Sequence, residues 1–301
     1  MKCTKSDLKS KNETNPDIKS KTNDYTGNIN KNIELNVLDK KVNLIVDFIR
    51  EYYETTGVKG VVLGLSGGID SSLVAHLAVK ALGADKVYGI IMPESKSNPM
   101  DKEHGELVAH LLGINYHISD ITPLMEAFGA GGYSKDENGN LKEFDKLADG
   151  NLKSRFRMCT LYYHANKNNN LVLGTGNKSE IYMGYGTKFG DLGCDVLPIG
   201  HLFKTEVREL ARYIGVPEDI ITKAPSGGLW EGQTDEKEMG ITYETLDKLL
   251  GAMEMGKDPE YTAELLNIST EQMINVMTRI DNNKHKSLPL PIPNKYLELI
   301  D

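Results

Sequence analysis

The sequence is poor in cysteine and has no long apolar run. Its three cysteines, Cys3, Cys159 and Cys194, are odd in number and far apart, so they predict neither a disulfide framework nor a zinc site built on paired cysteines. No segment approaches the roughly 18 uninterrupted apolar residues of a membrane-spanning helix, and the first residues lack the apolar core of a signal peptide. These absences predict reduced thiols, a cytoplasmic location and no membrane partner.

Net positive charge is also absent. The 301 residues carry a formal net charge of −8 at pH 7, whereas nucleic-acid-binding proteins usually present a basic stripe. We therefore expect no nucleic-acid partner. An anionic ligand would have to be bound by cations that the fold places locally.

The chain divides by composition after residue 33. Residues 1–33 are almost all Lys, Asn, Asp, Ser and Thr, and such a segment cannot bury enough apolar surface to order itself. We expect a disordered polar leader there, followed by a single domain over residues 34–301. With 39% apolar and 26% charged residues, the chain has the composition of an ordinary globular protein.

Apolar residues alternate between helical and strand patterns along the domain. A helix beginning near Leu38 and ended by Gly57 is followed by a βαβ unit, with apolar runs at 60–65 and 87–92 around a helix at 73–83. The alternation continues with runs at 115–119 and 171–174 and with helices near 101–112, 151–166, 178–184 and 204–215. This pattern predicts an α/β fold: a doubly wound, mostly parallel sheet with helices on both faces.

Such a sheet binds its ligand beyond the carboxyl ends of the strands, near the point where the strand order reverses. Three stretches rich in Gly and charge, 129–140, 184–195 and 225–240, are expected to be loops. Loops of this length are typical of lids over an active site. The tail from residue 241 predicts short helices and then the non-helical LPLPIP.

The stretch GLSGGIDSS at residues 64–72 joins a predicted strand to a predicted helix. Glycines let backbone N–H groups turn inward, and the start of the helix points its positive end at the same place, so the stretch predicts an anion cradle. It lacks the lysine of a Walker A loop and carries Asp70 instead. A carboxylate beside phosphates needs a cation such as Mg²⁺ between them. The alternative is a glycine-rich turn in which Asp70 caps the helix.

SGGIDSS resembles the PP-loop of the ATP pyrophosphatase superfamily, whose members release pyrophosphate and leave AMP on the substrate. Four further stretches resemble NAD synthetase, in the family's order and spacing over residues 35–290: GNLKSRFRM, LGTGNKSE, GTKFGDLGCDVLPIGHLFKTEVREL and the HK pair at 285–286. The resemblance implies the adenine nucleotide alpha hydrolase-like, Rossmann-like fold.

The resemblance also implies a two-step reaction that uses ATP and Mg²⁺. The nicotinate carboxylate of deamido-NAD attacks the α-phosphorus of ATP, and pyrophosphate leaves. Ammonia then displaces AMP to give the amide. Adenylation supplies the leaving group that a carboxylate lacks, and cations neutralise the departing pyrophosphate.

The same resemblance implies roles for individual residues. Asp70 and Glu180 match the family's magnesium carboxylates and form the catalytic set with Lys204. The ATP-binding positions are Gly64, Leu65, Ser66, Gly67, Gly68, Ile69, Asp70, Ser71, Thr175, Lys204 and Ser226, the last standing where the family usually has threonine. The positions that bind deamido-NAD are Arg155, Lys188, Asp195, His285 and Lys286.

The chain departs from common members of the family in two ways. Many ammonia-using members read GTDHAAE where this chain reads GTGNKSE, and glutamine-using members carry a nitrilase-like domain ahead of the synthetase. A polar leader of 33 residues cannot supply that domain, so we expect free ammonia as the nitrogen donor unless a separate glutaminase chain provides it. The family is dimeric with shared substrate sites, which implies a homodimer.

Three other interpretations are open at this point. Another PP-loop amidating or tRNA-modifying enzyme would be expected to carry a basic extension or paired cysteines, and neither is present in the sequence. A nucleotide-binding sensor without turnover would not need both Asp70 and Glu180. In the third interpretation, the chain is the synthetase subunit of a two-chain complex.

Overall fold

The computed structural model describes the backbone of residues 16–289 and the side chains of residues 34–289. The chain forms two compact units, residues 1–43 and 44–301. Residues 16–33, which composition predicts to be disordered, are helical, while residues 1–15 lie outside the described part. Pro16 stands in the first turn, where its missing N–H costs no hydrogen bond, and no further proline interrupts the chain before Pro93.

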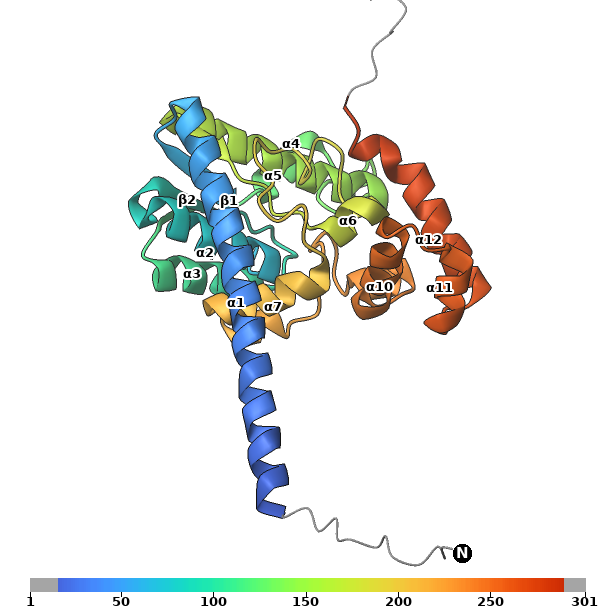
Figure 1. Cartoon of the computed structure of the whole chain (residues 1–301). Helices are drawn as coiled ribbons and strands as arrows, with labels where there is room; N and C mark the ends of the chain where they lie inside the picture. The colour runs from blue at the N-terminus through green and yellow to red at the C-terminus, as the bar shows by residue number, and fades with distance from the viewer. Residues whose placement is uncertain (1–15, 290–301) are drawn as a thin grey trace, which may run out of the picture. The chain divides into compact units, whose positions relative to one another are not determined.

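Helices make up most of the regular structure. In chain order they are α1 (Pro16–Thr56), α2 (Ile69–Leu82), α3 (Pro99–Leu112), α4 (Thr122–Phe128), α5 (Lys146–Asn168), α6 (Lys178–Met183), α7 (Lys204–Ile214), α8 (Glu218–Ile221), α9 (Asp235–Met239), α10 (Tyr243–Glu254), α11 (Pro259–Leu265) and α12 (Thr270–Asn283). Short 3₁₀ turns are η1 (Ala84–Lys86) and η2 (Lys284–Lys286). Figure 1 labels most of these elements.

The second unit is built on a parallel sheet. Its four strands lie in the order β3-β2-β1-β4, and all three strand pairs are parallel. The strands are β1 (Gly60–Gly64), β2 (Val87–Ile91), β3 (Asn115–Ile118) and β4 (Asn170–Val172). An isolated parallel bridge from Leu173 to Val196 continues the sheet beyond β4. The predicted α/β fold with a parallel sheet is confirmed.

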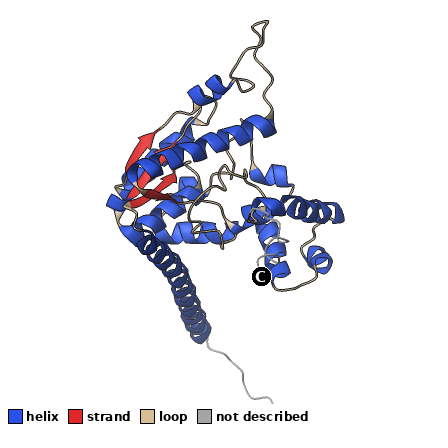
Figure 2. Ribbon diagram, turned by 90° about the horizontal axis from the view of Figure 1, so that it is seen from above, coloured by secondary structure: helices blue, strands red, loops and turns tan. Residues whose placement is uncertain are grey.

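Helices cover both faces of this sheet. Parallel crossovers are right-handed, and the chain moves one way from β1 through β2 to β3 but turns back to reach β4. The crossover helix α5 therefore lies on the face opposite α2 and α3. Val62, Ile90 and Val172 pack with Ala165 of α5 in one cluster, and Figure 2 shows the strands enclosed between helices. The central strands β1 and β2 are almost fully buried and therefore have nearly continuous apolar sequences, whereas the edge strand β3 alternates exposed and half-buried residues.

The strand order reverses between β1 and β4, which is where an open parallel sheet forms a ligand crevice. The two segments that leave the carboxyl ends of these strands are residues 65–68 and residues 173–177. They carry the GLSGGIDSS and LGTGNKSE stretches, so the topology brings the two sequence motifs to one edge.

The C-terminal helices form a second apolar cluster. Buried residues of α10, α11 and α12 pack with Met183 of α6, and these three helices lie together in Figure 1. The tail expected to form short helices does so. The LPLPIP stretch starts at Leu288, and its residues from 290 on lie outside the described residues.

Two of the three expected loops, 129–140 and 184–195, contain no helix. The third prediction, 225–240, is wrong at its end, because α9 occupies Asp235–Met239. The acidic residues of DEKEM favour a helix N-terminus, and Gly240 with φ +71° ends it. Among the described residues, no helix is long and apolar enough to span a membrane.

Candidate active site

The loop after β1 forms a cradle at the N-terminus of α2. Gly67 has φ +71°, and a Cβ placed on it would lie 2.1 Å from the carbonyl oxygen of Asp101, so only glycine fits. The Ser66 hydroxyl accepts a hydrogen bond from the Gly68 N–H at 3.3 Å. The N-cap of α2 is Gly68 and has no side-chain cap. The alternative in which Asp70 caps the helix is therefore wrong, and the helix start is available to an anion.

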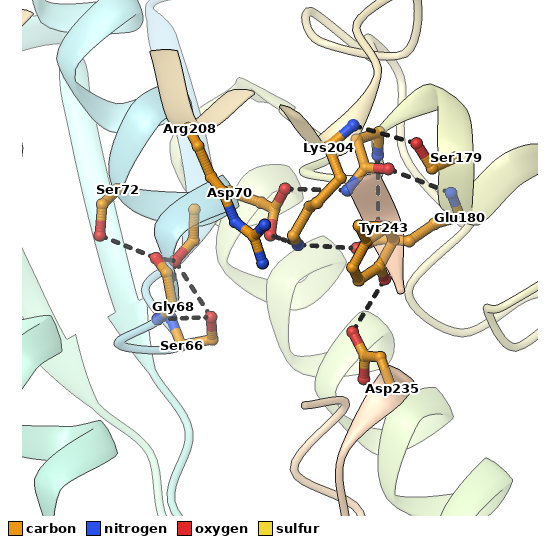
Figure 3. Close-up of polar contacts among 12 residues, drawn as sticks. Ser66, Gly68, Asp70, Ser72, Ser179, Glu180, Lys204, Arg208, Asp235 and Tyr243 are labelled. Atoms are coloured by element: carbon orange, nitrogen blue, oxygen red, sulfur yellow. Dashed lines mark hydrogen bonds and ion pairs between the residues drawn. The ribbon is translucent and has the colours of Figure 1, made fainter. Parts of the chain in front are cut away.

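Three charged side chains meet beside this cradle. The Lys204 Nζ lies 2.5 Å from the Asp70 Oδ2 and 3.1 Å from the Glu180 Oε1. The Lys204 side chain is only 2% exposed, whereas those of Asp70 and Glu180 are 18% and 17% exposed. Figure 3 shows the lysine between the two carboxylates. The three residues that resemblance groups as catalytic thus form one cluster.

Each member of this charge cluster, Asp70, Glu180 and Lys204, stands in the first turn of a helix. Asp70 is in the first turn of α2, Glu180 in that of α6, and Lys204 is the first residue of α7. Helix N-termini carry partial positive charge, which favours the two carboxylates where they stand. The same dipoles disfavour the ammonium of Lys204, so the carboxylates must hold it in place.

Asn177 links two members of the cluster. Its side-chain oxygen accepts a hydrogen bond from the Glu180 N–H at 3.0 Å, and the Glu180 Oε2 accepts one from the Asn177 N–H at 3.2 Å, which makes a capping box. The Asn177 Nδ2 donates to the Asp70 Oδ1 at 2.9 Å. Asn177 is fully buried. It joins the start of α6 to the start of α2.

A second network fixes the start of α7. The Asp247 carboxylate on α10 accepts hydrogen bonds from the Ser179 hydroxyl at 2.5 Å and from the Thr205 N–H at 2.8 Å. The Ser179 oxygen in turn accepts from the Lys204 N–H at 3.0 Å. Burial raises the pKa of Asp247 above its ordinary value, while these hydrogen bonds oppose the rise. The network sets the backbone position from which Lys204 extends.

Asp235 and Tyr243 complete the surroundings of Lys204. The Lys204 Nζ lies 5.3 Å from the centroid of the Tyr243 ring, and the Tyr243 hydroxyl donates to the Asp235 Oδ2 at 3.0 Å. The other oxygen of Asp235 is buried and has no hydrogen-bond partner among the described residues. Burial raises the pKa of Asp235, with Lys204 acting against the rise. Figure 3 shows both residues below the charge cluster.

The cluster has a definite protonation pattern. Burial alone would lower the pKa of Lys204, but Asp70 and Glu180 together raise it above the ordinary value. Burial raises the pKa of Glu180, and the nearby Asp70 carboxylate raises it further while Lys204 opposes the rise. The two carboxylates therefore favour the charged form of Lys204, and burial disfavours the charged form of Glu180.

A cavity of about 450 Å³ opens in front of the cradle and the cluster. Most of the residues predicted to bind ATP line it: Gly64, Leu65, Ser66, Gly68, Ile69, Asp70, Ser71, Thr175, Lys204 and Ser226. Gly67 is not among the lining residues, because its Cα faces Asp101. Asp235 lines the cavity as well, although its sequence context gave no signal.

Of the five residues predicted to bind deamido-NAD, only Lys286 lines the cavity. The Lys286 Nζ donates to the carbonyl oxygens of Gly184 and Gly186 at 2.8 and 3.0 Å. The Lys188 Nζ donates to the His285 carbonyl oxygen at 2.7 Å, which brings two predicted residues into contact although 97 positions separate them.

Arg155 and Asp195 form hydrogen bonds with different parts of the protein. Arg155 donates to the Lys188 carbonyl oxygen at 3.3 Å, so it belongs to the same group. The Asp195 Oδ1 accepts from the Tyr162 hydroxyl at 2.8 Å, and the Asp195 Oδ2 accepts from the Val172 N–H at 2.7 Å. In this structure Asp195 ties α5 to the end of β4.

The donor set at the cluster fits a magnesium ion that keeps other ligands. Among the described residues no group of three or more His, Cys, Asp or Glu side chains could hold a metal ion. Mg²⁺ in nucleotide sites is commonly held by one or two carboxylates together with waters and phosphate oxygens. Asp70 and Glu180 supply two carboxylates at the cavity, which is the protein's share of such a site.

Comparisons with known proteins agree with this geometry. The family model "NAD synthase" matches residues 41–289. The chain is 59% identical over 256 residues to the NH(3)-dependent NAD(+) synthetase of Methanocaldococcus jannaschii, covering 85% of this chain and 97% of that protein.

Solved structures give the same result. The structure of NMN synthetase from Francisella tularensis matches with a TM-score of 0.73 and 35% identity, over 85% of this chain and 98% of that one. The NH3-dependent NAD synthetase from Campylobacter jejuni matches with a TM-score of 0.69 and 32% identity, over 85% and 99%. The span matched by the family model, residues 41–289, contains the cradle, the charge cluster and the C-terminal helices. The chain therefore belongs to the NAD synthase family.

Proposed function

We propose that this protein is an ammonia-dependent NAD synthetase. It adenylates the nicotinate carboxylate of deamido-NAD with ATP, releases pyrophosphate, and lets ammonia displace AMP to form NAD in the last step of NAD biosynthesis. The observation that carries the proposal is the cluster of Asp70, Glu180 and Lys204 at the edge of a cavity that the phosphate cradle lines. The family membership of the chain supplies the reaction class.

The protein's own residues act mainly by binding and by neutralising charge. The N–H groups at the start of α2 and the hydroxyls of Ser66 and Ser71 hold the phosphates that leave as pyrophosphate. Lys204 supplies the cation that this loop lacks relative to a Walker A loop. Ser226 and Thr175 line the same cavity and contact the rest of ATP.

Asp70 and Glu180 are the residues that would hold Mg²⁺. When bound there, the ion supplies positive charge to the phosphate oxygens during departure of pyrophosphate. Asn177 holds the two carboxylates at a fixed separation, because its side chain forms hydrogen bonds with both Asp70 and Glu180. Asp235 has a buried oxygen at the cavity wall that no hydrogen-bond donor of the described residues 34–289 reaches, and this acceptor is suited to a positively charged or N–H donor group of the bound substrates.

The deamido-NAD site is proposed to be shared across a homodimer. Four of its five predicted residues lie outside the cavity lining, which fits a site that another subunit completes. Large apolar side chains are exposed on α4 and α5: Phe128 at 68%, Leu147 at 75% and Tyr163 at 64%. An apolar surface of this kind is typical of an interface.

Free ammonia is the proposed nitrogen donor, as in the relatives named NH(3)-dependent. A cytoplasmic location is also part of the proposal, because ATP and deamido-NAD are metabolites of that compartment.

One set of incubations tests the proposal. The purified chain is given ATP, Mg²⁺ and deamido-NAD with either ammonium or glutamine, and NAD, AMP and ADP are measured. NAD and AMP should form with ammonium. No NAD with either donor would contradict the synthetase proposal, and ADP in place of AMP would exclude release of pyrophosphate. Formation of NAD only after a glutaminase chain is added would identify a two-chain enzyme.

A second substrate sharpens the test, because one of the similar structures is an NMN synthetase. The mononucleotide analogue of deamido-NAD is offered in the same assay. A higher kcat/KM for deamido-NAD than for the mononucleotide is expected. The reverse order would make the mononucleotide the substrate.

A further inference from the structure

A buried ion pair lies apart from the charge cluster. The Lys153 Nζ on α5 is 2.6 Å from the Glu94 Oε2, and each side chain is only 1% exposed. The other carboxylate oxygen of Glu94 accepts a hydrogen bond from the Lys96 N–H at 2.6 Å. Glu94 follows β2, so the pair joins the edge of the sheet to the middle of α5.

The same ammonium binds a third segment. The Lys153 Nζ donates to the Leu229 carbonyl oxygen at 2.8 Å. Leu229 belongs to the segment of residues 225–233, which lines the cavity and carries Ser226. Next to it, the ring of Trp230 packs at Gly150, where an added Cβ would lie 3.2 Å from a ring carbon.

Aromatic rings of the 129–145 segment enclose the pair. The Lys153 Nζ lies 5.5 Å from the centroid of the Tyr133 ring and 5.2 Å from that of the Phe144 ring. Aromatic faces attract a cation and keep water away from it. The long loop at 129–140, which sequence motifs left without a role, thereby forms a wall of the Lys153 pocket.

Burying two charges is expensive, and an isolated ion pair is a poor way to gain stability. This pair, however, gives a charged donor to a backbone carbonyl in a segment without regular secondary structure. Hydrogen bonds from charged donors are about twice as strong as neutral ones. Within the segment, the Leu229 N–H donates to the Gln233 Oε1 at 2.9 Å, so a fixed Leu229 also fixes its neighbours.

We propose that Lys153, with its charge balanced by Glu94, is the positioning residue that fixes residues 225–233 and hence Ser226 over the nucleotide cavity. The inference deepens the proposed function and rests on it, since it assumes that the cavity binds ATP. Lys153 itself does not line the cavity, so it acts through the segment it holds.

The protein contains a natural probe for this test. Trp230 is the only tryptophan in the chain and follows Leu229 directly. Lys153→Met removes the ammonium, and Lys167→Met on the exposed end of α5 is the matched control. Lys153→Arg keeps a cation that can donate to both Glu94 and Leu229. If Lys153→Met does not fold because Glu94 is left unpaired, the double change Glu94→Gln with Lys153→Met removes both charges and takes its place.

Two readouts are taken from each folded variant. In Lys153→Met, Trp230 emission should shift to the red, and the KM for ATP in pyrophosphate release should rise about tenfold, the size expected for losing one charge-assisted hydrogen bond. The kcat should change less than KM. Lys153→Arg should recover at least part of both signals, and Lys167→Met should match wild type.

A merely structural role would give a different result. Lower thermal stability with unchanged Trp230 emission and unchanged KM for ATP would overturn the proposal, as would equal effects of Lys167→Met. Failure of the proposed function is separable from these outcomes. If the wild-type protein forms no NAD, the emission of Trp230 with and without ATP still compares the variants.

Discussion

The side-chain amide of Asn177 donates a hydrogen bond to the Asp70 carboxylate across 107 positions of sequence. The contact spans the point where the strand order reverses, because Asp70 follows β1 and Asn177 follows β4. Asn177 therefore sets the distance between the two carboxylates while it caps α6. It belongs to the GTGNKSE stretch.

Asn177 has two roles that substitutions can separate. Asn177→Ala removes the cap and the bond to Asp70, and we expect a loss of about 2–4 kcal/mol in the free energy of unfolding. Asn177→Ser keeps a capping oxygen but is too short to bridge to Asp70, so it should lose less stability. Urea denaturation measures both. Pyrophosphate release should fall in both variants; wild-type activity in Asn177→Ser would show that the bridge is dispensable.

The two carboxylates are predicted to be essential for adenylation but not for folding. Asp70→Asn and Glu180→Gln keep the shape of each side chain and remove its charge, so they should lower pyrophosphate release by at least about 10³-fold, comparable to losing a group that stabilises transition-state charge. Circular dichroism should show an unchanged fold. Wild-type pyrophosphate release from either variant would refute the metal assignment.

Gly67 is predicted to tolerate no side chain. Gly67→Ala meets both a positive φ and the Asp101 carbonyl oxygen, so the cradle must shift. Gly129→Ala is the matched control, because Gly129 has φ +77° with nothing within 4 Å of an added Cβ. The control should lose about 1–2 kcal/mol of stability and keep ATP affinity. Gly67→Ala should lower both the free energy of unfolding, measured by denaturation, and the affinity for ATP, measured by nucleotide titration. Equal affinities in the two variants would contradict the cradle.

His76 on α2 should make the protein less stable in mild acid. Burial lowers its pKa below the ordinary value of 6.5, while its Nδ1 lies 2.8 Å from the Ser72 carbonyl oxygen. The unfolded chain therefore takes up a proton at a higher pH than the folded chain does. The free energy of unfolding should fall as pH drops below about 6.5, by at most about 1.4 kcal/mol per pH unit from this group.

The comparison that isolates His76 uses His76→Gln, which cannot titrate. The free energy of unfolding of both proteins is measured at about pH 7.5 and about pH 5.5. Between the two pH values, wild type should lose more of this free energy than the variant does. Equal losses in the two proteins would mean that His76 keeps its ordinary pKa in the folded protein.

The exposed ring of Tyr163 tests the proposed homodimer. Its side chain is 64% exposed on α5, and Tyr163→Glu would place two like charges near each other if the surface pairs with a second copy. Sedimentation velocity should show wild type as a dimer and the variant shifted towards monomer, with weaker binding of deamido-NAD. Glu51→Gln on the exposed side of α1 serves as the surface control. A monomeric wild-type protein would end the shared-site proposal.

Much of this site can be read from local sequence, and the rest depends on packing between distant segments. Asp70, Glu180 and Lys204 stand in recognisable motifs, and the alternating pattern gives the sheet that brings the motifs together. The sequence also contains a pattern that predicts the capping role of Asn177, because Asn three residues before Glu is typical of a capping box.

Other functional contacts leave no local trace. The carboxylate of Asp247 reaches Ser179 across 68 positions, and Lys153 reaches Glu94 across 59. A lysine in a helical stretch reads as a surface group, because only the tertiary structure shows that aromatic rings enclose it. The helix that begins at Pro16 was likewise missed, since composition measures apolar content and not the ability of a polar segment to be helical.

Lys204 also bears on the order in which ligands reach the site. Its ammonium already acts as counter-ion to both carboxylates, so a bare divalent cation approaching the protein meets a site whose charge is partly cancelled. A cation that arrives on a nucleotide brings phosphate oxygens of its own and depends less on the two side chains. For the proposed metal site, this geometry favours entry of the metal together with the nucleotide over binding of the free metal.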